Sequence, residues 1–210
     1  TSKNLKITVE GYYKDFYKLV SYNRNRIYGD SWTTTHIPDY LKSFFLLEEG
    51  KAYGMDFLLD YNRDRLSIWL AYSLARVTRE DERMAYAPHY DRRHNLNILT
   101  GYAFGRDESW KLKARWNIGS GFPFTQINGV YEDFELNYGS FNSNFEANGN
   151  LNIWYSSLNE GRLPWYHRLD ISINKTFDFS EWQKLEFSLG IINVYNRRNM
   201  FYINRLSRER

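Results

Sequence analysis

The chain has 210 residues, 28 basic and 25 acidic side chains, a formal net charge of +3 and no cysteine. Charges of both signs are interspersed, which disfavours a phosphate-tracking surface and argues against nucleic acid as a partner. The lack of cysteine excludes disulfides and thiolate metal sites. With 42% hydrophobic and 19% aromatic residues, the composition excludes a disordered chain and suits one that is apolar on a single side.

Apolar and polar residues alternate with a period of two in seven segments, a pattern typical of strands. The first runs from Leu5 towards Tyr17, and the others cover residues 54–61, 66–75, 95–104, 110–119, 168–177 and 185–191. No segment has a convincing helical pattern, and no apolar run approaches the roughly 18 residues of a membrane helix. Taken strand by strand, the alternation fits a half-buried soluble sheet as well as a barrel wall.

The connections between these segments alternate strictly between long and short. The short polar turns are Asn62–Arg65, Gly105–Ser109 and Asp178–Trp182, and the long connections cover residues 23–50, 76–94 and 120–166. All short turns therefore lie at one end of the sheet, as in outer-membrane barrels. We predict an all-β, antiparallel, up-and-down transmembrane β-barrel, with strands of about ten to thirteen residues that match a tilted membrane span.

The cations of the fifth strand fix which face meets lipid. Lys111, Lys113 and Arg115 would together oppose insertion by roughly 6–12 kcal/mol if they faced the hydrocarbon. We therefore expect them to face the lumen, together with Arg168 and Asp170. Trp110 and Trp116, on the opposite face, are expected to lie in interfacial aromatic belts.

The strand number predicts that residues 1–210 form only part of a barrel. Bacterial single-chain barrels have an even number of at least eight strands, so seven strands cannot close. An open wall would leave unpaired backbone groups in lipid, each at a cost of several kcal/mol. We expect further strands on both sides of this segment.

Four runs of sequence point to a known family. They are Ala87–Ile98, Asn117–Gln126, Gly161–Phe177 and Ile192–Ile203. Together they resemble the carboxy-terminal barrel of TonB-dependent outer-membrane receptors, particularly those of Bacteroidota, and the resemblance covers nearly the whole chain. It implies that residues 1–210 are a carboxy-terminal portion of a 22-stranded barrel. The plug domain, the TonB box and the closing strand that the family implies are absent from this sequence.

The resemblance also implies a function. The resemblance implies an integral protein of the bacterial outer membrane. Such a protein binds a scarce nutrient (a siderophore, cobalamin, glycan or peptide) at extracellular loops and imports it with TonB-derived energy. The implied partners are outer-membrane lipid, the plug, the remaining strands, TonB and a surface lipoprotein; no enzyme activity and no cofactor are implied. The alternative is a non-transporting barrel that scaffolds a surface lipoprotein or a secretion and assembly complex. A soluble carbohydrate-binding sheet is the third class.

Aromatic residues on the long connections are the candidate ligand-binding groups, since flat side chains there can capture sugars, chelates or peptides at low entropic cost. They are Tyr86, Phe122, Phe124, Trp154, Tyr155, Trp165 and Tyr166. Packing of the loops on one another above a wide pore explains the same residues equally well.

A metal site is the other interpretation of the polar loop residues. Imidazole and carboxylate ligands suit zinc or iron, and the candidates are His89, Asp91 and His94, with His167 and Asp170 added. We favour a structural corner in which Asp91 bonds Arg92 or Arg93, because no third ligand has a regular spacing.

Overall fold

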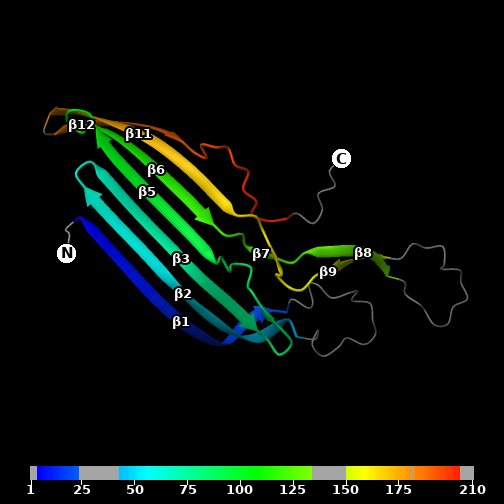
Figure 1. Ribbon diagram of the computed structural model, residues 1–210. Coiled ribbons are helices and arrows are strands. Elements are labelled where there is room, and N and C mark those ends of the chain that lie inside the picture. The colour runs from blue at the N-terminus through cyan, green and yellow to red at the C-terminus, as the bar shows by residue number, and fades with distance from the viewer. Residues whose placement is uncertain (1–3, 24–42, 134–149, 181, 204–210) are drawn as a thin grey trace, which may run out of the picture.

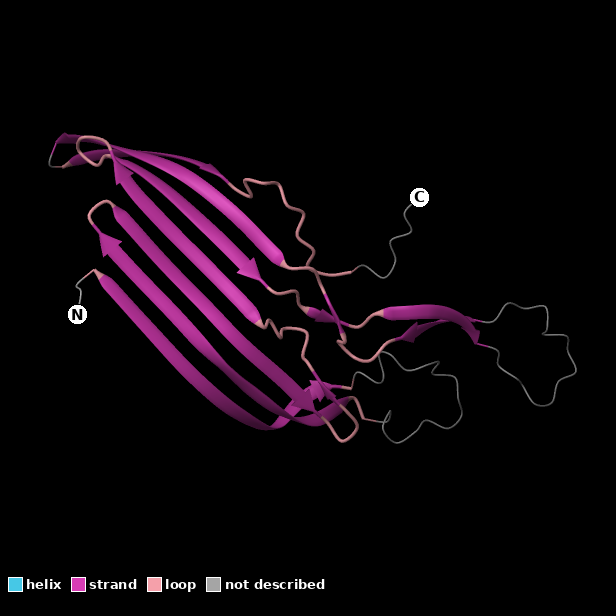
Figure 2. Ribbon diagram, viewed as in Figure 1, coloured by secondary structure: helices cyan, strands magenta, loops and turns pink. Residues whose placement is uncertain are grey.

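The computed structural model describes residues 4–23, 43–133, 150–180 and 182–203. Within these ranges the chain is all-β, and no helix long and apolar enough to cross a membrane is found there. One large antiparallel sheet contains seven long strands in the spatial order β1-β2-β3-β5-β6-β11-β12 (Figures 1 and 2). Their bounds are β1 Leu5–Tyr22, β2 Phe45–Arg63, β3 Leu66–Glu80, β5 His94–Phe104, β6 Trp110–Gly119, β11 Tyr166–Ser180 and β12 Gln183–Ile191. The two-residue strand β4 (Ala85–Tyr86) pairs with β3.

The seven long strands are the seven predicted from the sequence, and their order in space follows their order in the chain. The strands joined by short connections (β2–β3, β5–β6 and β11–β12) meet at one end of the sheet, and the strand ends that lead into the long connections lie at the other end (Figure 1). We call these the turn end and the loop end. The predicted up-and-down arrangement, with all short turns on one side, is confirmed.

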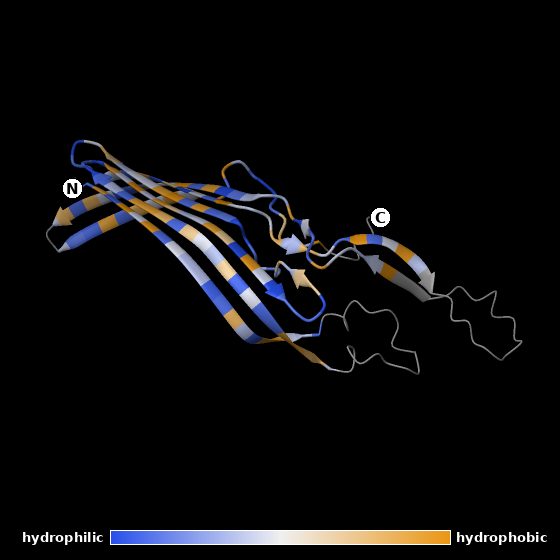
Figure 3. Ribbon diagram, turned by 60° about the horizontal axis from the view of Figure 1, so that its bottom comes forward, coloured by the Kyte–Doolittle hydropathy of each residue, from blue (hydrophilic) through white to orange (hydrophobic). Residues whose placement is uncertain are grey.

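The register of the strands separates apolar from polar side chains across the whole sheet. One transverse row aligns Leu59, Leu70, Ile98, Trp116 and Leu169, and the next aligns Asp60, Trp69, Leu99, Arg115 and Asp170. Because successive side chains of a strand point to opposite faces, these rows lie on opposite sides of the sheet. We call them the apolar face and the polar face; the alternation of hydropathy along each strand is visible in Figure 3.

The apolar face is not covered by any part of the chain that the structure describes. Ala52 and Leu163 are the buried hydrophobic residues of these ranges, whereas large side chains such as Ile7, Met55 and Leu189 are 53%, 57% and 71% exposed. Soluble monomers rarely expose a contiguous apolar surface of more than a few hundred Å². The sheet therefore lacks a dry core of its own and needs an apolar surrounding.

Several strands are longer than predicted. β2 begins at Phe45 rather than near residue 54, β1 continues to Tyr22 across a bulge at Lys18 (φ 54°), and β3 continues to Glu80. The early part of β2 does alternate, but its buried positions are Glu48, Gly50 and Ala52. Because a carboxylate, a glycine and an alanine occupy these buried positions, the sequence shows no hydrophobic alternation there. The start of this strand was therefore predicted too late in the chain.

The long connection over residues 120–166 was predicted without strands, and this was wrong. It contains two small antiparallel pairs, β7 (Pro123–Phe124) with β10 (Gly161–Arg162), and β8 (Ile127–Asp133) with β9 (Asn150–Tyr155). The β8–β9 hairpin extends past the loop end of the sheet (Figure 2). Its richness in asparagine and glycine masked the alternation, because these residues favour turns over strands.

We expect Gly121→Ala to lower the melting temperature of the full-length protein, with a loss of about 1–3 kcal/mol from overpacking. A Cβ at residue 121 would lie 1.6 Å from the backbone oxygen of Leu163. Gly129→Ala is the control, since a Cβ there would lie 3.8 Å from the Trp154 ring. Equal melting temperatures for the two variants would contradict the close backbone approach.

Candidate functional site

Charged side chains that the sequence singled out share the polar face of β6 and β11. Asp170 lies opposite Arg115 in the register, and its Oδ2 accepts a hydrogen bond from Arg168 Nη2 at 2.8 Å. The other oxygen of Asp170 accepts the backbone N–H of Asn193 at 2.9 Å. The residues placed on this face are Lys111, Lys113, Arg115, Arg168 and Asp170.

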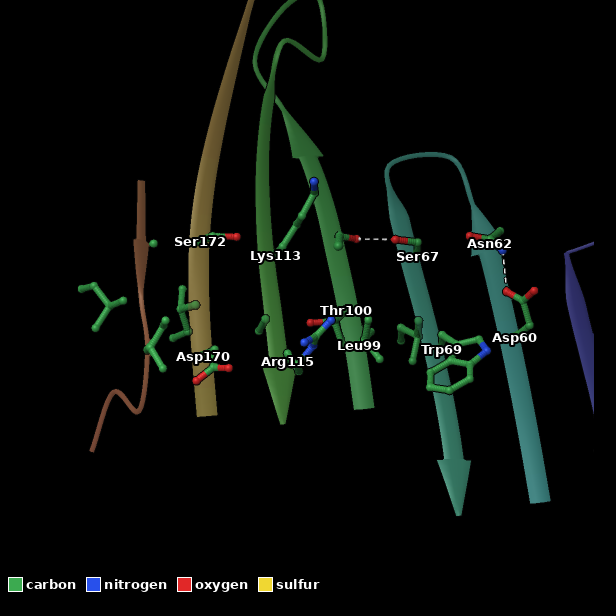
Figure 4. Close-up of a pocket in the computed structure, with 17 residues that line it drawn as sticks. Asp60, Asn62, Ser67, Trp69, Leu99, Thr100, Lys113, Arg115, Asp170 and Ser172 are labelled. Atoms are coloured by element: carbon green, nitrogen blue, oxygen red, sulfur yellow. Dashed lines mark hydrogen bonds between the residues drawn. The ribbon is translucent and has the colours of Figure 1, made fainter. Parts of the chain in front are cut away.

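A shallow hollow of about 420 Å³ crosses the polar face from β2 to β12, and we call it the wall hollow (Figure 4). It combines charges of both signs with apolar residues that include Trp69 and Leu99, which are 38% and 36% exposed. Asp60 flanks this pair on one side, and Lys113 and Arg115 flank it on the other. The polar face thus carries a mixed surface rather than a uniformly charged one.

A buried ion pair at Asp91 connects four segments of the loop end. The Asp91 side chain is 1% exposed and pairs with Arg162, while Arg93 lies 3.8 Å away. Asp91 also accepts the backbone N–H of Val77 at 3.0 Å, and Arg162 donates to the carbonyl of Gly121 at 3.3 Å. Asp91 does anchor a structural corner, but the predicted local hydrogen bond to Arg92 or Arg93 was wrong: Arg93 reaches Asp91 only as an ion pair, and Arg162, from a distant part of the sequence, is the hydrogen-bonded partner.

The candidate metal ligands do not converge. His94 Nδ1 lies 2.8 Å from the hydroxyl of Tyr72, on the apolar face, and Asp91 is engaged by arginines. His167 Nδ1 lies 2.7 Å from the hydroxyl of Tyr195. No group of three histidine, aspartate or glutamate side chains suited to a metal ion occurs among the residues that the structure describes.

Aromatic side chains gather around a larger hollow at the loop end, which we call the rim hollow. Its volume is about 900 Å³. It contains two of the predicted ligand-binding residues, Phe122 and Phe124, and a smaller hollow of about 330 Å³ that shares Phe122 with it adds a third, Tyr166. The other aromatic residues around the rim hollow are His89, Tyr90, Phe201 and Tyr202.

Arg92 lies inside this aromatic group. Its guanidinium carbon is 4.4 Å from the centre of the Phe122 ring and 5.5 Å from that of Tyr166. It occupies the space above Gly119, where a Cβ would come within 2.7–2.8 Å of the guanidinium atoms. Burial lowers the pKa of Arg92 from its ordinary value, although an arginine stays charged at neutral pH. The rings thus hold a partly desolvated cation.

An irregular segment after β12 brings Phe201 to this site. β11 extends beyond the last residue of β12 that pairs with it, and the segment supplies the missing hydrogen bonds: Val194 N donates to the carbonyl of Leu169 at 2.8 Å. The Asn199 amide bonds both the N–H and the carbonyl of His167, at 3.1 and 3.0 Å. Phe201 then lies 5.5 Å from Tyr166, ring centre to ring centre.

The remaining predicted aromatic residues lie apart from the rim hollow. The Tyr86 hydroxyl is 3.0 Å from both oxygens of Glu48, a fully buried carboxylate that also pairs with Arg79. Trp154 and Tyr155 are on β9, where Trp154 is 63% exposed. Trp165 stacks on His94, with the ring centres 5.6 Å apart.

Sequence reasoning missed Arg92 and Phe201 as members of the site. Arg92 stands between Asp91 and Arg93, so its neighbours suggested a local ion pair. Phe201 belongs to one of the runs that carry the family resemblance, but nothing in the sequence placed that run beside Tyr166. The assembled site offers aromatic faces, a cation and side-chain amides, a combination that suits binding of a small polar molecule.

A solved structure of a known protein is similar to this fold. No family model matches the sequence, and no curated protein matches it. The fold is that of part of an outer-membrane β-barrel, by its likeness to a solved receptor. That structure is the ferripyoverdine receptor of the outer membrane of Pseudomonas aeruginosa bound to ferripyoverdine, at 12% sequence identity and a TM-score of 0.58. The match covers 95% of this chain and 22% of the receptor chain, so the chain spans about a fifth of its length.

We expect Asp91→Asn to reduce the free energy of unfolding of the full-length protein by about 3 kcal/mol, because it leaves the part-buried Arg162 without its counter-charge. Asp178→Asn is the matched control. Its pair with Lys184 is 3.4 Å long and the two side chains are 61% and 69% exposed, so at most about 1 kcal/mol should be lost. Denaturant titration measures both, and equal losses would contradict the anchoring role of Asp91.

Proposed function

We propose that this chain forms part of the barrel wall of a TonB-dependent outer-membrane transporter of the Bacteroidota type, which binds a scarce nutrient at its loop end. The observation that carries the proposal is the uncovered apolar face of a sheet whose short turns all lie at one end. A membrane is the surrounding that such a face requires, because it removes large apolar side chains from water. The likeness to an outer-membrane receptor supports the same assignment.

In this proposal the polar face lines the lumen. A cation at mid-membrane costs about 2–4 kcal/mol on the lipid side, and β6 alone carries three, Lys111, Lys113 and Arg115. Turning the sheet inside out would also expose Asp60 and Asp170 to lipid, since they lie in the same row as Arg115. The distribution of charge therefore supports this orientation in addition to the apolar residues.

Both ends of the apolar face have groups that suit a membrane interface. Near the loop end, Trp116 Nε1 donates to the hydroxyl of Tyr195 at 3.2 Å. Near the turn end, Lys175 Nζ lies 5.1 Å from the centre of the Trp110 ring and 5.3 Å from that of Phe177. Lys175 is a cation on the apolar face, and its place at the turn end lets the ammonium reach the wet layer while its stem stays in apolar contact.

The two edges of the sheet support a larger barrel. In the described ranges β1 pairs only with β2 and β12 only with β11. Unpaired backbone groups in hydrocarbon cost several kcal/mol each, so a membrane wall has to close. We propose that further strands complete the cylinder, that residues 1–210 form its carboxy-terminal portion, and that a plug domain and TonB supply gating and energy.

Cysteines at positions 112 and 113 test the two-sided wall. In the full-length protein within outer membranes, Leu112→Cys should react with a lipid-soluble maleimide and Lys113→Cys with a small charged, water-soluble one, because neighbouring residues face opposite sides. Mass spectrometry of the labelled protein measures both reactions. Equal labelling of the two positions by both reagents would rule out a wall between lipid and water.

Arginine substitutions test the same wall energetically. Leu70→Arg places a cation on the apolar face and should reduce folding into lipid vesicles by about 2–4 kcal/mol. Ser73→Arg places it on the polar face, where the Ser73 hydroxyl now bonds Asp56, and should cost much less. Urea titration of the full-length protein in vesicles gives both values; a larger loss for Ser73→Arg would refute the proposed orientation.

A further inference from the structure

We infer that Arg92 binds the carboxylate of an acidic sugar held in the aromatic group of the loop end. The inference rests on the proposed function, because a nutrient site at this end requires the loop end to face the outside. It goes further by assigning a chemical class to the ligand and one residue to its charge. Three features of the loop end support it: an unpaired cation, neighbouring amides and flat apolar surfaces.

The charge of Arg92 is not compensated within the part of the chain that the structure describes. Its neighbour Arg93 and the distant Arg162 share Asp91, and Arg79 pairs with Glu48. No carboxylate of the described residues lies within ion-pair distance of Arg92, and its buried Nε has no hydrogen-bond partner there. A partly buried guanidinium without a counter-charge is costly, and the carboxylate of a ligand would supply that counter-charge.

The surroundings of Arg92 suit a ring with hydroxyl groups. The smaller hollow is lined by Asn95, Asn97 and Asn117 beside Arg92, and Asn117 Nδ2 donates to Asn97 Oδ1 at 2.5 Å. Each amide keeps donor and acceptor capacity for hydroxyl groups. The Phe122, Tyr166 and Phe201 rings offer flat apolar surfaces to the carbon–hydrogen face of a sugar. Hollows of about 330 and 900 Å³ are in the range of small-molecule sites, about 300–1,000 Å³.

Two features separate this site from the other charged groups of the polar face. Lys113 and Arg115 share the wall hollow with Asp60 and Asp170, so that hollow contains two charges of each sign. Arg92 instead sits among uncharged side chains, fixed between two rings and above Gly119. A cation that is already oriented loses little side-chain freedom on binding, which favours a single preferred place for the ligand carboxylate.

The test compares trigalacturonate with its fully methyl-esterified form, which keeps the rings and hydroxyl groups and removes the charges. Calorimetric titration into the full-length protein in detergent should give at least about tenfold tighter binding of the acid, equal to about 1.4 kcal/mol. Arg92→Gln should abolish this preference and change binding of the ester less than about twofold. Arg65→Gln, at the turn end and paired with exposed Glu108, is the control and should keep the preference.

Two results would overturn the inference: wild-type protein that binds acid and ester equally, or an Arg92→Gln variant that still prefers the acid. If the carboxylate partner of Arg92 belongs instead to another part of the full-length protein, the wild type shows no preference and Arg92→Gln lowers the melting temperature. Binding in detergent is independent of transport. Preference for the acid without import would therefore overturn the transporter proposal alone, and import of another nutrient without preference would overturn the acidic-sugar site alone.

Discussion

The structure depends on one constraint: the backbone of each inner strand is hydrogen-bonded to both neighbours, so only side chains meet the surroundings. With a side-chain period of two, the register then decides which side chains share a face. A slip of one residue between β5 and β6 would place Trp116 among the charges of the polar face and Arg115 among Leu70, Ile98 and Leu169. The cost of that exchange in an apolar surrounding specifies the pairing more strongly than any single contact.

The same constraint shapes the loop end, where regular pairing stops. β11 continues past β12, and its free backbone groups are satisfied by Val194 and by the amide of Asn199. This irregular edge places Phe201 against Tyr166, which a continuous strand would not do at that point. The position of Phe201 in the candidate site therefore follows from the way in which the segment after β12 satisfies the backbone hydrogen bonds at the loop end of β11.

The strands could be predicted from sequence wherever alternation and hydropathy coincide, as at Trp110–Gly119. The start of β2 could not be predicted, because its buried positions are Glu48, Gly50 and Ala52. Glu48 is buried because it pairs with Arg79, and not because it is hydrophobic. The aromatic members Phe122, Phe124 and Tyr166 were identifiable as aromatic residues of the long connection, although Phe124 lies on β7 and Tyr166 begins β11. Their assembly was not, because it depends on pairings such as that of Arg162 with Asp91, which join residues 71 positions apart.

At the loop end Asp91 and Arg93 take part in ion pairs, whereas Arg92, which stands between them in the chain, has no ion-pair partner among the described residues. Asp91 is fully engaged by Arg162 and Arg93, and this pairing fixes the backbone on both sides of Arg92. Glu48, held by Arg79 and Tyr86, fixes the neighbouring connection in the same way. Because these carboxylates pair with other residues, Arg92 lies against the rings of Phe122 and Tyr166 without a counter-charge among the described residues. A rigid frame around one uncompensated cation is the arrangement that binding an anion requires, since the frame removes the reorganisation that binding would otherwise demand.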